Sequence, residues 1–368
     1  MPQGPSDERC RLLIPRLEVG ANDAPAQRFA RLARWFDNLF LRGTFNGTIL
    51  IARNGEAQFA RSYGFADIPA KVPVTARTAF SLASVSKQFT GMAILLLRAQ
   101  GRLRLDDLLS HHIPELGFYR GVTLMHLLHH TSGLPDYAEL AAAFWDRTRL
   151  LTQADMIALI ATHRAEPYFA PGDAFEYSNT GYALLGEVII RASEMSFPDF
   201  MQAAIFAPLR MTDSAAYNLT APRFPLAERA FGFSRDKGGR GPVQPRDLNT
   251  LDGTYGDGGL YASAADLLIW DRALRDGALL PTDAYREAYA PARLNDGTLS
   301  SYGFGWDLVS ETVVKHWGEW EGFSAYLRRS LAQRTLLVLL SNLGPPACVD
   351  AMTTELDAFM DVPPPAMA

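Results

Sequence analysis

The chain has 368 residues, of which 48% are hydrophobic and 20% are charged, proportions typical of a soluble globular protein. Its formal net charge of −5 excludes the strongly basic surface that nucleic-acid binding requires. No apolar run approaches the roughly 20 residues of a membrane-spanning helix, so we expect a folded protein without a membrane span.

Two features bear on the cellular compartment. The two cysteines, Cys10 and Cys348, are too few for a disulfide framework or a cysteine-based zinc site. Residues 1–20 carry scattered charges and lack the apolar run of about seven or more residues that a signal peptide contains. We therefore expect a cytoplasmic protein, or a periplasmic one if the true start lies upstream.

Several structural units are expected, because the length corresponds to two or three at roughly 150 residues each. Residues 1–24 and the proline-rich residues 361–368 are expected to be loose tails. We assign 25–80 and 250–360 to an α/β lobe with an antiparallel sheet, and 81–249 to a mainly helical lobe. The fold class is therefore α/β in the broad α+β sense.

The first expected elements are a helix and a hairpin. Asp23 as the cap, Pro25 in the first turn and Gly43 after the last turn delimit the helix. Two strand-like runs follow at 44–52 and 56–65, and Asn54-Gly55 between them is a strong hairpin signal.

Strand patterns then disappear until the end of the chain. They return as four runs, at 302–308, 312–317, 323–327 and 335–341. The simplest arrangement is one antiparallel sheet built from both chain ends, flanked by helices, with an all-α lobe inserted. Because small-molecule sites often lie between lobes, we expect a site there.

The first motif with chemical potential is Ser84-Val85-Ser86-Lys87, which opens a helix ended by Gly101. Ser84 would lie at the helix N-terminus, where free N–H groups favour a developing negative charge. Lys87 is one turn further on the same face and, if its pKa is lowered, can take the serine proton. Alternatively, Ser84 is only a helix cap and Lys87 a solvated charge.

A second motif, Tyr177-Ser178-Asn179, lies in a loop at the start of another expected helix. Its phenol can relay a proton, and its amide can hold a substrate carbonyl and orient a lysine. A half-buried core tyrosine and a capping asparagine would give the same pattern.

The third motif, His316-Trp317-Gly318, lies on an expected strand. Gly318 permits close approach of a ligand along the strand, and Trp317 offers bulk and an apolar face. The N–H groups of Glu319 and Ser84 are candidates for an oxyanion hole. A lone histidine on a strand is also commonly structural.

Together, these motifs resemble the serine β-lactamase and penicillin-binding protein superfamily, most closely the branch of class C β-lactamases, D,D-peptidases and related esterases. Further segments carry the resemblance, which covers residues 29–345: Leu127–Pro135, Tyr177–Tyr182 and Gly258–Leu267. It implies a β-lactamase/transpeptidase-like fold and acyl transfer through an ester on Ser84.

The expected roles follow from the resemblance and from the chemistry of the side chains. Lys87 and Tyr177 share the base and acid roles, and the sequence does not say which takes the first proton. Asn179 orients the substrate and Lys87, while His316 hydrogen-bonds to Tyr177. The resemblance implies no metal and no organic cofactor.

The third motif departs from the Lys-Thr/Ser-Gly pattern of class C β-lactamases and most penicillin-binding proteins. Histidine is mostly uncharged near neutral pH, so a substrate carboxylate would lose a charge-assisted hydrogen bond. Arg328 or Arg329 would restore the charge only if it reached the cleft. We therefore expect a small ester or amide as substrate, with β-lactamase or D-alanyl-D-alanine carboxypeptidase activity as the alternative.

Two other classes remain as alternatives. A metal-dependent hydrolase would use the clustered histidines His111, His112, His126, His129 and His130, but no carboxylate completes a H-E-x-x-H pattern. His129 and His130 fit better as supporting residues behind the site. A catalytically idle scaffold is the second alternative. The oligomeric state is left open.

Overall fold

The central element is a six-stranded antiparallel sheet with the strand order β10-β11-β12-β13-β1-β2. The structure is a computed structural model that describes residues 13–20, 23–221, 223–235, 241–344 and 348–361. The strands are β1 (Gly47–Arg53), β2 (Glu56–Tyr63), β10 (Asp307–Ser310), β11 (Val313–Trp320), β12 (Phe323–Ser330) and β13 (Thr335–Ser341). The expected sheet from both chain ends is confirmed, because β1 pairs with β13.

The hairpin between β1 and β2 forms at the predicted turn. Asn54 and Gly55 have φ angles of 53° and 78°, both in the left-handed region. Two such residues in succession are what a tight two-residue turn requires, and Asn-Gly supplies them at low cost.

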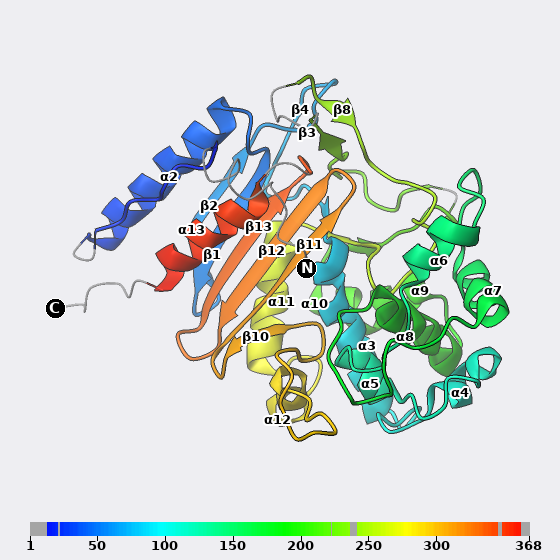
Figure 1. The fold of residues 1–368 in the computed structure, drawn as a ribbon. Coiled ribbons are helices and arrows are strands. Elements are labelled where there is room, and N and C mark those ends of the chain that lie inside the picture. Colours follow the sequence, from blue (N-terminus) through cyan, green and yellow to red (C-terminus); the bar gives the residue numbers. More distant parts are fainter. Residues whose placement is uncertain (1–12, 21–22, 222, 236–240, 345–347, 362–368) are drawn as a thin grey trace.

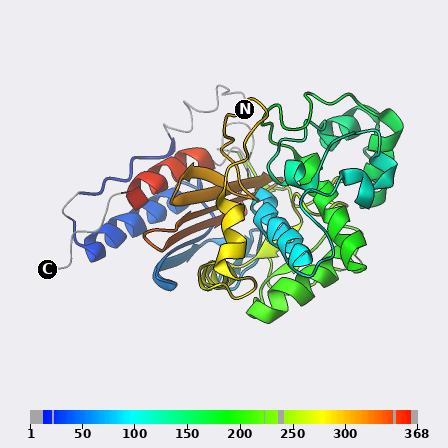
Figure 2. The same cartoon turned by 90° about the horizontal axis from the view of Figure 1, so that it is seen from below.

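Helices cover both faces of the sheet (Figures 1 and 2). Helices α2 (Pro25–Leu41) and α13 (Val349–Asp361) bury one face against a core that includes Phe36, Ile49 and Leu339. Helix α11 (Ala264–Asp276) packs on the opposite face, against β1 and β13.

The middle of the chain is mainly helical and lies beside the sheet (Figure 1). Its helices are η1 (Ala83–Ser86), α3 (Lys87–Ala99), α4 (Leu109–His112), η2 (Pro114–Leu116), α5 (Leu124–Leu128), α6 (Tyr137–Phe144), α7 (Gln153–His163), α8 (Asn179–Ser193), α9 (Phe197–Met201), η3 (Gln202–Phe206) and α10 (Ala207–Leu209). Two short helices, α12 (Thr282–Tyr285) and η4 (Arg286–Tyr289), precede the last strands.

One apolar core joins the sheet to the helices. It contains Leu50 and Val338 from the sheet together with Phe89 of α3 and Tyr182 of α8. The sheet and the helices that carry the motifs are therefore packed into each other. The predicted lobe boundaries stay a prediction.

Several short strands lie outside the predicted elements. They are β3 (Phe65–Asp67), β4 (Val72–Pro73), β5 (Phe80–Ser81), β6 (Ala215–Ala216), β7 (Phe233–Ser234), β8 (Gln244–Pro245) and β9 (Leu260–Ala262). Three of them form a small sheet in the order β5-β9-β6. Strand β5 ends directly before the turn that carries Ser84, so this small sheet fixes the start of that turn.

Two expectations at the N-terminus are wrong. The N-cap of α2 is Ala24, not Asp23, whose carboxylate instead accepts from the Gly20 N–H and pairs with Arg31. Residues 13–20, which we expected in a loose tail, pack on the domain: Ile14 is buried in the core under α2 and α13. Burial of the Ile14 side chain in this core holds residues 13–20 against the domain.

The strand expected at 302–308 begins only at Asp307. Residues 302–306 cross the start of α3 instead, where a Cβ on Gly305 would lie 2.3 Å from the Gln88 nitrogen. Tyr302, Phe304 and Trp306 are fully buried there. The alternating pattern that suggested a strand therefore reflects aromatic packing.

Two remaining observations concern the cysteines and the membrane. Cys348 is disulfide-bonded, and Cys10 lies outside the described residues, as does the tail at 362–368. Within the described part of the chain, no helix combines the length and apolar character needed to cross a bilayer.

Candidate active site

Ser84 lies in a sharp turn between β5 and α3. Ser81 pairs with Tyr261 of β9, and the Leu82 N–H donates to the Leu260 carbonyl at 2.9 Å. Ala83 then adopts a left-handed φ of 45°, unusual for a residue with a side chain. Among residues 81–90, Ser84 alone is not buried. The turn therefore presents its hydroxyl at the start of a helix, as expected.

The Lys87 amine is fully buried and makes three hydrogen bonds. Its Nζ lies 3.1 Å from Ser84 Oγ, 2.9 Å from Asn179 Oδ1 and 2.9 Å from the Asp257 carbonyl oxygen. The last two oxygens can only accept, so they engage both N–H groups of a neutral amine. The lone pair of that amine then faces the Ser84 hydroxyl, which is the arrangement of a general base beside its nucleophile.

Two opposing effects determine the pKa of the Lys87 amine. Burial lowers its pKa to about 8, while the carboxylates of Asp257 and Asp136 oppose this fall. An amine with such a pKa is neutral in about a tenth of the molecules at pH 7 and in about half of them at pH 8. Lys87 is therefore a usable base, and a solvated lysine at this position is excluded.

Tyr177 lies in the loop before α8, with its ring 4.9 Å from Lys87 Nζ. Burial raises the pKa of its phenol strongly, although its interaction with Ser84 lowers that pKa in part. The phenol thus holds its proton at neutral pH and is a donor rather than a base. Asn179 follows at the first turn of α8 and donates to Asp136 at 3.4 Å.

The expected hydrogen bond between His316 and Tyr177 is not the one that His316 makes. His316 Nδ1 donates to the Trp317 carbonyl at 2.6 Å, and Nε2 accepts from the Tyr302 hydroxyl at 2.8 Å. The rings of His316 and Tyr177 are 6.2 Å apart between centroids. His316 therefore supports Tyr302, whose ring packs edge-on against Tyr177.

His316 is a neutral residue in this environment. Burial, followed by the nearby Lys87, lowers its pKa to about 3. The third motif thus lacks the fixed positive charge that a lysine would supply.

The strand alternation of β11 corrects the assignment of Trp317. His316 is buried and Gly318 faces the Ser84 turn, whereas Trp317 packs on the other face of the sheet, in the core under α2 and α13. It does not line the pocket beside Ser84. Because strand side chains alternate with a period of two, this separation was available from the sequence once His316 was placed inward.

Gly318 permits a close approach, but the partner is the chain itself. A Cβ at this position would lie 2.5 Å from the Leu82 oxygen, 2.8 Å from the Ser84 nitrogen and 3.0 Å from the Val85 nitrogen. The backbone of β11 is thereby held against the turn that carries Ser84. The N–H groups of Ser84 and Glu319, the residue after Gly318, belong to these two adjoining segments.

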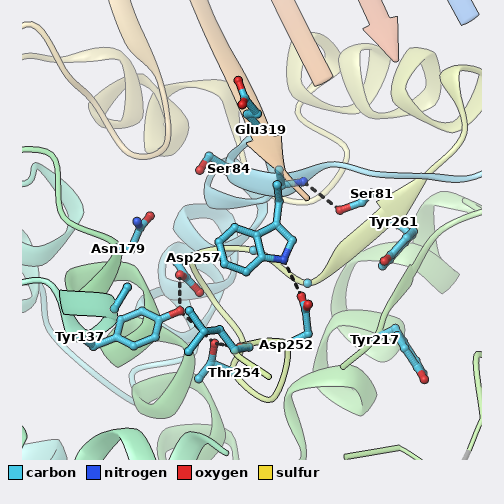
Figure 3. A pocket seen from close by; sticks show the side chains of 16 residues that line it. Ser81, Ser84, Tyr137, Asn179, Tyr217, Asp252, Thr254, Asp257, Tyr261 and Glu319 are labelled. Carbon is cyan, nitrogen blue, oxygen red and sulfur yellow. Dashed lines mark hydrogen bonds between the residues drawn. The ribbon is translucent and has the colours of Figure 1, made fainter. Parts of the chain in front are cut away.

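A pocket opens beside Ser84 (Figure 3). Four aromatic side chains line it: Tyr137, Tyr217, Tyr261 and Trp320. Asp252 accepts a 2.8 Å hydrogen bond from the indole nitrogen of Trp320 and thereby fixes that wall.

The charged lining of this pocket is acidic. Asp252, Asp257 and Glu319 line it, and no lysine or arginine does so among the described residues. Burial raises the pKa of Asp252 to about 7, and that of Asp257 is raised as well. In Figure 3 the Glu319 carboxylate points away from both aspartates. A negatively charged group entering here meets acids and no fixed cation.

The two arginines that could have restored a positive charge are engaged elsewhere. Arg328 pairs with Asp357 at 3.3 Å and also with Asp361, both on α13. Arg329 is buried and pairs with Asp271 of α11 at 2.6 Å. Neither lines the pocket.

The histidines that suggested a metal site have separate partners. His112 contacts Asp107, His126 caps α5 through Thr123, and His129 donates to the Tyr302 carbonyl. In the described ranges, no three His, Cys, Asp or Glu side chains form a group that could hold a metal ion.

Four supporting residues around the site were not assigned from the sequence. Asp257 and Asp136 act on the Lys87 amine, and Tyr137 donates to Asp257 at 3.0 Å. Tyr302 links His316 to Tyr177. The position of Asp257 directly before the Gly258–Leu267 segment was the available signal, whereas Tyr302 had none, because its segment resembled a strand.

The known proteins that this chain resembles are β-lactamase-family and penicillin-binding proteins. The β-lactamase family model matches residues 32–359. The chain is 36% identical to penicillin-binding protein 4* of Bacillus subtilis (strain 168) over 318 residues, 83% of this chain and 70% of that protein. A penicillin-binding protein structure from Bacillus halodurans aligns with a TM-score of 0.74 and 26% identity, covering 87% of this chain and 98% of that one.

A solved amidase structure shares the fold. The D-amino acid amidase from Ochrobactrum anthropi SV3 aligns with a TM-score of 0.72 over 98% of both chains. Its identity to this chain is 22%, so this likeness concerns the fold alone.

The contact between β11 and the Ser84 turn predicts the effect of Gly318→Ala. The added methyl group must displace backbone atoms, which costs about 1–3 kcal/mol of unfolding free energy. Denaturant unfolding measures this loss. The matched control is Gly258→Ala, because the nearest atom to a Cβ there is the Ala83 oxygen at 3.9 Å. Equal stability of the two variants would contradict the packing described.

Proposed function

The chain belongs to the β-lactamase family of serine hydrolases, and we propose that it acts through an acyl-enzyme on Ser84 with a small ester or amide as substrate. The observation that carries this proposal is the hydrogen bonding of the Lys87 amine. Asn179 Oδ1 and the Asp257 carbonyl oxygen accept from the N–H groups of the amine. The third partner of the amine is the hydroxyl of Ser84.

In the first step, neutral Lys87 accepts the Ser84 proton while Ser84 Oγ attacks the substrate carbonyl carbon. The carbonyl oxygen becomes an oxyanion. The N–H groups of Ser84 and Glu319 are proposed to stabilise it, and the close approach of Gly318 to the Ser84 nitrogen supports this pairing.

In the second step, the bond to the leaving alcohol or amine breaks as that group takes a proton. Tyr177 is proposed as the donor, because its raised pKa keeps the phenol protonated and its ring lies beside Lys87. Protonated Lys87 then returns a proton to the phenolate. The product is a Ser84 ester, which water hydrolyses with the same groups acting in reverse.

The remaining assigned residues position these groups. Asn179 holds the Lys87 amine through Oδ1 and is available to the substrate carbonyl side. His316 fixes Tyr302, and Tyr302 in turn packs against Tyr177. Trp320, held by Asp252, replaces Trp317 as the aromatic residue proposed to contact substrate.

The charge of the pocket favours a substrate without a carboxylate. A carboxylate would meet the acids Asp252 and Asp257, and no lysine or arginine lines the pocket among the described residues. A charge-assisted hydrogen bond of about 1.5–3 kcal/mol would thus be missing. Esters and amides without a carboxylate incur no such loss.

A second candidate activity is hydrolysis of a β-lactam or a D-alanyl-D-alanine peptide. It is supported by the relatives named as penicillin-binding proteins. An idle scaffold is disfavoured, because it would not need a buried lysine beside a serine.

Replacing Ser84 tests the nucleophile. Ser84→Ala should lower hydrolysis of a short-chain aryl ester by about 10⁴-fold or more, as nucleophile removal does in serine proteases. Mass spectrometry after treatment with an aryl phosphonate should show one adduct in the wild type and none in the variant. Ser81→Ala is the control, since Ser81 lines the same pocket without contacting Lys87. An unimpaired Ser84→Ala variant refutes the assignment.

The Lys87 pKa predicts the pH dependence. Because only the neutral amine accepts a proton, kcat/KM should rise with pH through an inflection near 8. Asp136→Asn removes a carboxylate that stabilises the ammonium form, so the inflection should move to lower pH. Asp106→Asn should leave it unchanged, because Asp106 is exposed and is not one of the carboxylates that act on Lys87. If the inflection in kcat/KM of Asp136→Asn lies at the same pH as in the wild type or at a higher pH, this electrostatic explanation is contradicted.

The acidic pocket predicts substrate ranking. A neutral aryl acetate should be cleaved with a higher kcat/KM than a chromogenic cephalosporin, which carries a carboxylate. Asp252→Asn should narrow the gap by removing a negative charge while keeping an acceptor for the Trp320 indole. A cephalosporin preferred by the wild type would overturn the ranking and favour the second candidate activity.

A further inference from the structure

His130 is a buried imidazole directly behind the loop at 176–179, which carries Tyr177 and Asn179 and is called the catalytic loop below. None of the steps proposed for the reaction uses this imidazole. Its side chain is 1% exposed and does not line the pocket. Its backbone has a left-handed φ of 58°, which is uncommon for a residue with a side chain. The sequence predicts only a supporting place for it behind the site.

Three consecutive residues of the catalytic loop contact His130. Its carbonyl oxygen accepts from the Glu176 N–H at 3.0 Å, and its Nδ1 accepts from the Ser178 N–H at 3.1 Å. Between these two bonds, its ring packs against the Tyr177 ring with 4.4 Å between centroids. The loop is thus held on both sides of the phenol.

The hydrogen bond from Ser178 fixes the state of the imidazole. A backbone N–H can only donate, so Nδ1 is unprotonated and the ring proton is on Nε2. Burial, followed by the nearby Lys87, keeps the His130 pKa well below its ordinary value, so the ring is neutral. The other titratable groups around it are His316 and His129, together with the phenols of Tyr177, Tyr182 and Tyr302.

The tautomer with the proton on Nε2 carries an energetic penalty in this environment. Nε2 is buried and has no hydrogen-bond partner among the described residues. An unsatisfied buried donor costs about 1–3 kcal/mol, which an apolar side chain of similar size would avoid. The surroundings of the ring are the aromatic rings of Tyr177, Tyr182 and Tyr302. Apolar packing alone therefore does not account for an imidazole here.

We propose that His130 is a positioning residue that holds Tyr177 and Asn179 in their catalytic geometry by accepting the Ser178 N–H through Nδ1. The inference rests on the proposed acyl-enzyme function and adds to it a residue outside the pocket. The Ser178 hydroxyl caps α8 by accepting from the Gly181 N–H at 3.2 Å, so the same residue joins the loop to the helix that carries Asn179.

The test compares two substitutions that differ in the acceptor. His130→Asn places an amide oxygen near the position of Nδ1, and asparagine tolerates a left-handed φ. His130→Phe keeps an aromatic ring and removes the acceptor. Acylation by an aryl ester is followed in single-turnover experiments, with thermal unfolding in parallel. His129→Phe is the matched control, because His129 is a neighbouring buried imidazole that bonds to the Tyr302 carbonyl and not to the catalytic loop.

His130→Phe should slow acylation by about 10²-fold, the loss that a displacement near 1 Å can cause. His130→Asn should restore most of that rate, and His129→Phe should retain more activity than His130→Phe at similar unfolding temperature. If His130→Phe is as fast as the wild type, or if Asn and Phe are equally slow while both stay folded, the proposal is overturned.

A measurement on the unchanged protein covers the case in which His130→Phe does not fold. Nitrogen-15 NMR of labelled histidines should show one buried ring protonated at Nε2 only and not titrating between about pH 5 and 9, where an ordinary histidine does. A His130 ring protonated at Nδ1, or charging in this range, overturns the proposal. If the wild type neither hydrolyses aryl esters nor reacts with phosphonates, the proposed function fails instead, and this tautomer is still measurable.

Discussion

The burial of the Lys87 amine against the Ser84 hydroxyl is the interaction on which the rest of the site depends. A buried cation is costly, and burial lowers the pKa of this amine to about 8. The oxygens of Asn179 and Asp257 compensate by accepting from Nζ. Burial disfavours the protonated form of Lys87, and for the same reason it makes the amine available as a base near neutral pH.

Segments far apart in the sequence supply this environment, and backbone contacts hold them in register. Strand β11 approaches the Ser84 turn at Gly318, where no side chain fits. Ala83 bends into a left-handed conformation to present the serine, a strain of about 1–3 kcal/mol that the surrounding small sheet must maintain. The buried His316 is neutral and the charged side chains that line the pocket are acidic, and the proposed preference for uncharged substrates rests on these two features.

Local geometry could be predicted from the sequence, and distant contacts could not. The turn at Asn54-Gly55 and the one-turn separation of Ser84 and Lys87 follow from rules that act over a few residues. The partner of His316 does not, because Tyr302 reaches it from a segment whose aromatic residues imitate a strand. The misplacement of Trp317 was avoidable, since strand alternation alone puts it opposite His316.

The central claim is that burial lowers the pKa of Lys87 far enough for the neutral amine to be populated near neutral pH, and a direct titration of its amine tests it. The chain contains only four lysines, so ¹³Cε NMR of labelled lysine is tractable, and Lys87→Arg identifies the signal. The account predicts a midpoint near 8 for Lys87, with ordinary values near 10.4 for solvated lysines. A Lys87 midpoint at the ordinary lysine value would contradict the account, because the amine would then be charged and unable to accept the Ser84 proton.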